Sequence, residues 1–478
     1  MAASSTLQPG KVDPDYKTLL WLVALGFFMQ SLDSTIVNTA LPNIARSLGE
    51  SPLNMQSVVV AYVLSVAAII PASGWLADRI GIRAAFLSAI VIFSSASLLC
   101  ALSQTLPQLI AARILQGVGG AMLLPVGRLA ILRIVPRAQF LAAMSFITIP
   151  GLIGPLIGPA LGGWLVEIGT WHWIFLINLP IGVIGALLTL RVMPVLKNPA
   201  VPAFDLSGYA LLVVGMVCLS LSLDGLSDHS MVAKMLILLI MGTAALVGYG
   251  FHAHRHSNAL FRADLFKNRT FSIGIFGNLF ARLGGGCIAF LMPLMLQLAL
   301  GYSPIEAGLM MMPLVLGAMT IKRVITPLIR RFGYRRVLVT NTLLVGLGIA
   351  SFALIPADQP TWLKVIHFFI FGMINSVQFT SMNTLTLKDL KPQHASSGNS
   401  LLSMIMMLSM SLGVAAAAAI LSGFTVHYQQ QVLSAFHATF ICMGLMTVAA
   451  AWIFWQLEPE DKHGERQEQA EVGLPESS

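Results

Sequence analysis

Charged residues are scarce in this chain. Only 10% of its 478 residues are Asp, Glu, Lys or Arg, whereas about a quarter of the residues of a soluble domain carry a charge. Acidic residues are the rarer sign, with 20 Asp and Glu against 28 Lys and Arg, and 56% of all residues are hydrophobic. This composition excludes an ordinary soluble domain and predicts a protein that crosses a membrane several times.

Cysteine is also rare, and several catalytic motifs are missing. The cysteines fall inside apolar runs without metal-ligand spacing, at Cys100, Cys218, Cys287 and Cys442, which indicates core packing and not disulfides or a metal site. The sequence contains no G-x-x-x-x-G-K-[ST], H-E-x-x-H or G-x-S-x-G motif, which would mark nucleotide-binding loops, zinc proteases and α/β hydrolases. We therefore predict no catalytic residues, no metal, no cofactor and no direct use of ATP.

Long apolar runs recur along the whole chain. Each has the length of about 20 residues that a helix needs to cross a hydrocarbon layer about 30 Å thick, and each is too continuous for a barrel strand. Fourteen spans are predicted, at 18–41, 55–76, 84–103, 107–127, 140–164, 173–193, 207–225, 232–252, 271–299, 304–325, 337–356, 362–385, 397–422 and 435–456. The expected fold class is an all-α polytopic membrane protein.

Basic residues are unevenly distributed between the connecting segments. The segments assigned to the cytoplasm hold most of the 28 Lys and Arg, while those assigned to the outside hold only Arg46, Lys234 and Lys364. This bias places both termini in the cytoplasm, where the basic segments are expected to meet anionic membrane lipid and not nucleic acid. Asp13 and Asp15 stand where a signal peptide would be basic, so the first helix is expected to be retained.

The chain contains an internal repeat. GWLADRIGIR, residues 74–83, aligns without gaps with TPLIRRFGYR, residues 326–335. Paired halves with a site at their interface are a recurring plan of transporters. We expect a cytoplasmic N-terminus at 1–17, a six-helix bundle at 18–194, a linker with two extra helices at 195–270, a second six-helix bundle at 271–456 and a cytoplasmic tail at 457–478.

Three motifs of the first half have a distinctive order of residues. GWLADRIGIR combines glycines, which permit close packing and a tight turn, with charged residues; these positions are Gly74, Asp78, Arg79, Gly81 and Arg83. ARILQGVGGAMLLP places Arg113, Gln116 and Gly117 on one helical face, which predicts a buried cation beside a groove. GLIGPLIGPALGG predicts a flat, kinked packing face, made of Gly151, Gly154, Pro155, Gly158, Pro159 and Gly162.

Together with LDSTIVNTALP and WHWIFLINLPIG, these motifs resemble those of the major facilitator superfamily. Over nearly its whole length the chain is similar to the fourteen-helix drug:proton antiporters of the EmrB/QacA type, and within them to the MdtD-like exporters. The resemblance implies proton-driven export of drugs or small amphipathic compounds by alternating access across a bacterial cytoplasmic membrane. It also implies that GLIGPLIGPALGG is an antiporter motif and that the GWLADRIGIR loop is a conformational latch. In the outward-open state we expect Asp78 to approach the start of the thirteenth predicted helix, near 396–399, because the positive end of a helix dipole favours a carboxylate.

Two positions depart from that pattern. Arg330 stands in the second repeat where Asp78 stands in the first, so the second loop lacks the carboxylate. Arg282 places a cation in the ninth predicted helix, which is unexpected for an exporter of lipophilic cations.

Asp33 is a carboxylate inside the first predicted helix. It lies about 21 Å along that helix from Leu19, at a depth where a charge costs several kcal/mol. Gln30, Ser34 and Asn38 share its side of the helix, so we expect this side to face a central cavity. The resemblance favours Asp33 as a proton carrier with Arg113 as its partner, and a purely structural ion pair is the alternative.

Several other polar residues are candidates for the transport path. The predicted substrate cavity comprises Gln30, Ser34, Asn38, Gln116, Asn178, Arg282, Asn375 and Gln378. For the amides, hydrogen bonding between helices is an equally favoured alternative. Glu306 and Asp224 are weaker proton-carrier candidates than Asp33, because they lie near helix ends, where an interfacial position is favoured. His367 could also titrate, but a lone membrane histidine is more often a hydrogen-bonded packing residue.

A second function within transport is a carrier of an anionic or zwitterionic metabolite. A cavity with Arg113, Arg282 and one deep carboxylate would repel cations unless Asp33 is ionised and exposed. A membrane enzyme and a transport-dead sensor are weaker alternatives. The sequence does not determine the substrate or the proton stoichiometry, and a monomer is compatible with it.

Overall fold

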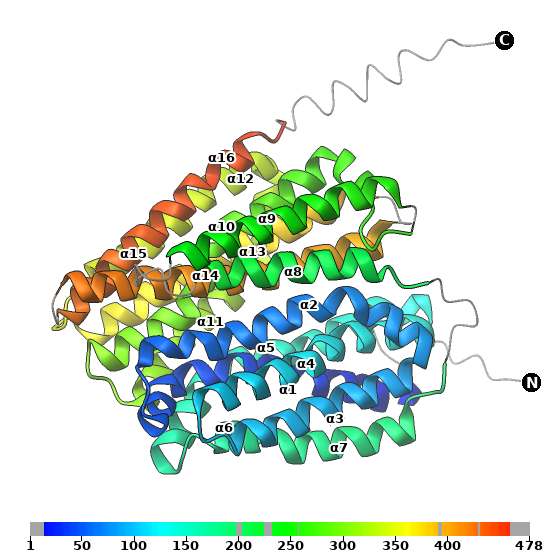
Figure 1. The fold of residues 1–478 in the computed structure, drawn as a ribbon, viewed down its shortest axis with the longest axis horizontal. Coiled ribbons are helices and arrows are strands. Elements are labelled where there is room, and N and C mark those ends of the chain that lie inside the picture. Colours follow the sequence, from blue (N-terminus) through cyan, green and yellow to red (C-terminus); the bar gives the residue numbers. More distant parts are fainter. Residues whose placement is uncertain are drawn as a thin grey trace, which may run out of the picture.

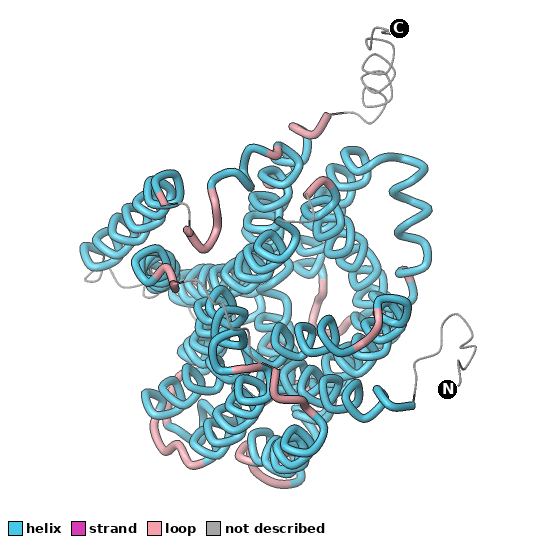
Figure 2. The backbone as a smooth tube through the Cα atoms, turned by 90° about the vertical axis from the view of Figure 1, so that its right-hand side faces the viewer, coloured by secondary structure: helices cyan, strands magenta, loops and turns pink. Residues whose placement is uncertain are grey.

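The computed structural model describes residues 14–196, 203–223, 232–256, 258–390, 394–428 and 431–458. Within these ranges every regular element is a helix (Figure 2). Helices suit long apolar runs because they satisfy every backbone N–H and C=O within the same segment. The expected all-α class is therefore confirmed for the part of the chain that the structure describes.

The N-terminal half forms the lower bundle in Figure 1. Its first helix has 35 residues and continues through Pro42. The elements are α1 (Pro14–Leu48), η1 (Pro52–Met55), α2 (Gln56–Ile80), α3 (Ile82–Ala101), α4 (Leu106–Ile134), α5 (Arg137–Ile168), α6 (Trp173–Leu176) and α7 (Asn178–Val192).

Two helices follow between the halves, α8 (Leu206–Ser222) and α9 (Val232–Arg255). They pack along each other. A contact joins the start of α8 to the last turn of α9, where His252 Nε2 lies 2.8 Å from Asp205 Oδ1. α8 also reaches both halves. The ring of Phe204, just before it, lies tilted against Trp75 of α2 with the ring centroids 4.8 Å apart, and Ser220 Oγ lies 2.9 Å from Ser411 Oγ of the C-terminal half. The extra pair thus lies on the seam between the bundles.

The C-terminal half forms the upper bundle in Figure 1. It repeats the plan of the first, with long helices joined by short connections. Its elements are η3 (Ala263–Lys267), α10 (Arg269–Leu298), α11 (Pro304–Thr320), α12 (Lys322–Ser351), η4 (Phe352–Leu354), α13 (Thr361–Lys388), α14 (Ala395–His427), α15 (Val432–Ala449) and α16 (Ala451–Trp455).

The number of membrane spans differs from the prediction. Among the described residues, 12 helical segments are long and apolar enough to cross a membrane. The predicted spans 207–225 and 304–325 correspond to α8 and α11, which are apolar but have only 17 residues each. α11 ends at Thr320, but Ile321 keeps a helical backbone with φ −73° and ψ −15°, and α12 begins at the next residue. Helix length therefore supports a multi-pass membrane protein but not a count of fourteen.

The internal repeat reappears in the backbone. Gly81 ends α2 with φ 92° and ψ 149°, and its counterpart Gly333 interrupts α12 with φ 75° and ψ 158°. Residues with a side chain rarely adopt such positive φ values. The aligned glycines therefore make the same turn in the two halves.

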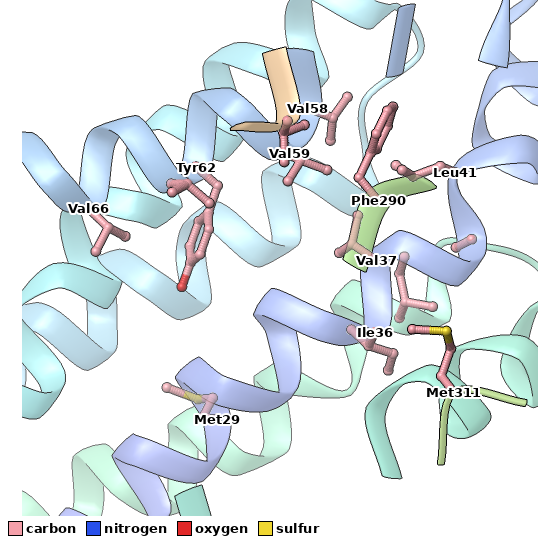
Figure 3. Packing of buried hydrophobic residues seen from close by; sticks show 14 of the residues in the cluster. Met29, Ile36, Val37, Leu41, Val58, Val59, Tyr62, Val66, Phe290 and Met311 are labelled. Atoms are coloured by element: carbon pink, nitrogen blue, oxygen red, sulfur yellow. The ribbon is translucent and has the colours of Figure 1, made fainter. Parts of the chain in front are cut away.

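The two halves are closely joined at the end opposite the described N-terminus. There Gln297 Nε2 of α10 donates to the backbone oxygen of Thr39 in α1 at 2.9 Å. Figure 3 shows Phe290 of α10 beside Leu41 of α1 and near Val58 of α2. Phe290 is fully buried, so this end of the interface is apolar and sealed.

Candidate functional site

Asp33 lies at the centre of a buried polar network in the N-terminal half. Arg113 Nη1 of α4 donates to Asp33 Oδ2 at 2.6 Å. The other carboxylate oxygen, Oδ1, accepts from Gln116 Nε2 at 2.8 Å and from Asn178 Nδ2 at 3.0 Å. The side chain of Asp33 is 0% exposed and that of Arg113 is 1% exposed. An ion pair is thus enclosed by amide donors from α4 and α7.

Arg113 has further contacts that hold its guanidinium in place. Its Nη1 also donates to Gln116 Oε1 at 2.6 Å, and its Nε reaches the backbone oxygen of Val58 at 3.4 Å. The guanidinium carbon lies 4.1 Å from the ring centroid of Tyr62, a distance that favours a cation–π contact. The guanidinium therefore has one charged partner, the Asp33 carboxylate. Its neutral partners are the Gln116 amide, the backbone oxygen of Val58 and the ring of Tyr62.

Sequence reasoning missed two members of this network. Ser97 of α3 accepts from Gln116 Nε2 at 2.7 Å and from Asn178 Nδ2 at 3.2 Å, which fixes the orientation of both amides. Tyr62 of α2 covers the guanidinium, and its hydroxyl is buried without a hydrogen-bond partner among the described residues. Both are polar residues in otherwise apolar helices, and only the packing of α2 and α3 against α4 shows that they meet this network.

The polar residues predicted to share one side of α1 differ in how deeply they are buried. Asp33 is sealed from solvent and does not face an open cavity in this arrangement, because α4 and α7 supply its donors. Gln30 and Ser34 are partly exposed. Asn38 is buried, and its Nδ2 makes only a long 3.5 Å contact with the backbone oxygen of Ser34.

The amides predicted to line the substrate cavity also lie in different surroundings. Gln116 and Asn178 belong to the Asp33 network. Gln378 joins α13 to α12, donating to Thr342 Oγ1 at 2.7 Å and accepting from Asn341 at 2.9 Å. Asn375 is partly exposed. Hydrogen bonding between helices therefore accounts for Gln378, while Asn375 remains a cavity candidate.

The weaker proton-carrier candidates have structural roles. Glu306 forms a capping box at the start of α11, where its Oε2 accepts from the backbone N–H of Ser303 at 2.8 Å. His367 lies 2.7 Å from Ser351 Oγ and stacks on Phe352. Asp224 lies outside the described residues.

The GWLADRIGIR segment covers the end of α2, the turn at Gly81 and the start of α3. Its charged residues make their described contacts within the N-terminal half. Asp78 forms an ion pair with Arg133 at the end of α4, and both side chains are 29% exposed. Arg83 donates to the backbone oxygen of Leu190, and Arg79 lies 5.5 Å from the ring centroid of Trp75. A Cβ at Gly74 would meet nothing within 4 Å. We expect Asp78 to approach residues 396–399 at the start of α14 when the halves are open to the outside. In the arrangement described here its ion pair is with Arg133 of the same half, and no described hydrogen bond or ion pair joins it to 396–399. The contact with α14 stays a prediction for the outward-open state.

We expect Asp78→Asn to slow transport while changing the free energy of unfolding by less than about 1 kcal/mol, since exposed ion pairs contribute little stability. The matched change Arg133→Gln should have the same effect if the pair acts as one unit. Exchanging the charges in Asp78→Arg/Arg133→Asp should restore transport, measured as substrate flux into vesicles. Normal turnover in both single variants would contradict a latch role for this loop.

One face of α5 lies directly against α1. A Cβ at Gly154 would be 2.7 Å from the backbone nitrogen of Leu32, and one at Gly162 would be 2.5 Å from the backbone oxygen of Ile36. Gly158 faces Thr35 and Gly151 faces Phe27 with still less room. Pro155 and Pro159 lie inside the same helix. The glycines thus allow α5 to approach the part of α1 that carries Asp33.

Comparison with known proteins agrees with this two-bundle plan. The family model described as "Major Facilitator Superfamily" matches residues 23–414 and 274–477. The chain belongs to the major facilitator superfamily. Its membership places it among membrane transporters and not among enzymes.

Two relatives and two solved structures illustrate the likeness. The chain is 52% identical to the "Putative multidrug resistance protein MdtD" of Serratia proteamaculans over 91% of its own length and 92% of the relative. The protein of that name from Yersinia enterocolitica is also 52% identical, over 91% and 94%. The fold resembles a crystal structure of a D-xylose-proton symporter (TM-score 0.65, 15% identity, 93% and 98% covered) and of the transporter PepTSo (TM-score 0.68, 13% identity, 91% and 96% covered).

Proposed function

We propose that this protein exports drugs or other small amphipathic compounds in exchange for protons, by alternating access between its two halves. The observation that carries the proposal is the sealed Asp33–Arg113 pair. A charged pair is costly to bury, and ionisable residues within membrane spans commonly mark proton or substrate pathways. The 52% identity to proteins named for multidrug resistance supports export as the direction of transport.

The hydrogen bonds suggest how proton binding would act on the fold. Every described partner of the Asp33 carboxylate is a donor, namely Arg113, Gln116 and Asn178. An ionised carboxylate accepts from all of them, whereas a protonated one has an O–H donor facing other donors. Protonation of Asp33 would therefore weaken the hydrogen bonds that join α1 to α4 and α7, and it would favour a movement of α1.

The interface between the halves supports alternating access. The halves are sealed at one end by Gln297, Phe290 and the close approach of α5 to α11. With the termini in the cytoplasm, as the positive-inside bias predicts, this arrangement is closed towards the outside. We further propose fourteen spans in the bacterial inner membrane, with α8 and α11 crossing together with their flanking residues, and a monomer as the working unit.

Proton flux in vesicles tests the proposal. A thermal-shift screen of drugs, dyes and organic acids first identifies a compound that binds the purified full chain. Adding it to one side of proteoliposomes that contain a trapped pH indicator should move protons towards that side. Protein-free vesicles are the control. Substrate flux that leaves the internal pH unchanged would contradict proton coupling.

A further inference from the structure

Arg282 is a cation at membrane depth without a described acidic partner. It lies about 20 Å along α10 from Arg269, at 1.5 Å per residue. Its Nη2 donates to Asn278 Oδ1 at 3.3 Å, and its Nε is buried without a hydrogen-bond partner. None of the salt bridges among the described residues includes it. Among the described residues, Arg282 thus has no carboxylate partner of the kind that Asp33 provides for Arg113.

The surroundings of Arg282 indicate that it faces the interior of the protein. Its guanidinium carbon lies 4.4 Å from the ring centroid of Phe379 on α13. Phe379 is 44% exposed and Arg282 is partly exposed, so the two share one surface. A cation at membrane depth almost always faces a bundle interior or a water-filled cavity. We therefore expect the surface shared by Arg282 and Phe379 to line such a cavity and not the lipid boundary.

A glycine on the same side of α10 allows Asn375 of α13 to approach closely. Gly285 follows Arg282 by three residues, so both lie on one side of α10. A Cβ at Gly285 would be only 3.2 Å from Asn375 Oδ1 on α13. Arg282, Asn375 and Phe379 consequently form one wall, with a cation, an amide and an aromatic ring.

The chemistry of this wall favours an acid as its ligand. A guanidinium binds a carboxylate through two parallel N–H donors, and Arg282 has donors that no described carboxylate occupies. The ring of Phe379 offers apolar surface next to that charge. A lipophilic cation could contact the ring of Phe379, but the guanidinium of Arg282 would repel it.

We propose that Arg282, Asn375 and Phe379 form the subsite for the carboxylate of an amphipathic organic acid, so that the exported compound is an anion with an apolar ring. This inference rests on the proposed transport function and names its substrate class. Exchange of an anion leaving the cell for a proton entering it moves positive charge inwards in both steps. An inside-negative potential should therefore accelerate it.

Matched probes test the subsite in the full chain. We would measure binding of benzoate and naphthoate, of their neutral amides, and of naphthylmethylammonium. A charge-assisted hydrogen bond should make the carboxylates bind about tenfold or more tightly than their amides. In Arg282→Gln this preference should fall to about one, and Arg282→Lys should restore part of it. Arg323→Gln removes the same charge from the exposed start of α12 and should leave the preference unchanged.

The possible outcomes separate the subsite from the transport proposal. Carboxylates that bind no better than their amides, or a preference that persists in Arg282→Gln, would overturn the subsite. The same holds if Arg282→Gln loses proton-coupled exchange of a neutral amide that the wild type exchanges, because Arg282 would then act in coupling. If carboxylates bind through Arg282 but no probe moves protons in the wild type, the subsite stands and the proposed antiport fails.

Discussion

Asp33→Asn is expected to reduce transport driven by a pH gradient to the level of protein-free vesicles while substrate binding persists. An asparagine resembles the protonated acid in shape but cannot release a proton. Exchange of substrate between the two sides, without net proton movement, should survive. Flux in the presence and absence of a pH gradient, together with substrate binding, measures this difference.

The same substitution should also lower the free energy of unfolding. It leaves the 1% exposed guanidinium of Arg113 without a described carboxylate, and breaking a buried ion pair on one side costs about 3–5 kcal/mol. Gln116 Oε1, the backbone oxygen of Val58 and the ring of Tyr62 remain as neutral partners. We therefore expect a loss at the lower end of that range and a protein that still folds.

A double variant separates a proton carrier from a structural pair. Asp33→Asn/Arg113→Gln removes both charges, so it should recover stability relative to Asp33→Asn. If Asp33 carries the proton, gradient-driven transport should stay absent in the double variant. If transport returns with stability, the pair is structural. Full gradient-driven transport in a well-folded Asp33→Asn protein would contradict both roles.

The sequence allowed prediction of the features that depend on local pattern. Apolar runs located the helices, because a chain in hydrocarbon must satisfy its own backbone groups. The turn at Gly333 followed from its alignment with Gly81, because both positions need a positive φ. The sequence also predicts the pairing of Asp33 with Arg113, because they are the only deep charges of the first half.

Features that depend on how helices rotate against each other were beyond the sequence. Ser97 is one of several serines in apolar helices, and only the packing of α3 on α4 brings it to Gln116. Asp78 could be assigned to the cytoplasmic end, but several cations and helix starts are gathered there. Its selection of Arg133 depends on the distance between α2 and α4, which no residue pattern encodes.

Gly162 and Gly163, two adjacent glycines of α5, should give different phenotypes when each is changed to leucine. A Cβ at Gly162 meets the backbone of Ile36 in α1, within one half. A Cβ at Gly163 overlaps the backbone of Pro304 at the start of α11, across the interface between halves. Gly162→Leu should therefore impair folding of the N-terminal bundle. Gly163→Leu should leave each bundle intact and keep the outer end from closing.

The expected size of the Gly163 effect follows from the cost of overpacking. An inserted side chain that a packed interface cannot accommodate costs about 1–3 kcal/mol, which corresponds to about a five- to 150-fold shift between the two arrangements of the halves. Transport should fall accordingly, while thermal stability stays close to that of the wild type. A cysteine placed at Ser34, which is partly exposed, should become reactive towards a membrane-impermeant reagent added from outside.

Gly250 supplies the control for both variants, because a Cβ there would meet nothing within 4 Å. Gly250→Leu on α9 adds the same side chain to a helix and should leave folding and transport near wild type. Gly162→Leu that folds and transports normally would show that α1 and α5 can separate without loss of the Asp33 site. Gly163→Leu that transports normally, with no gain in outside reactivity at residue 34, would show that contact between α5 and α11 is not needed for closure at this end.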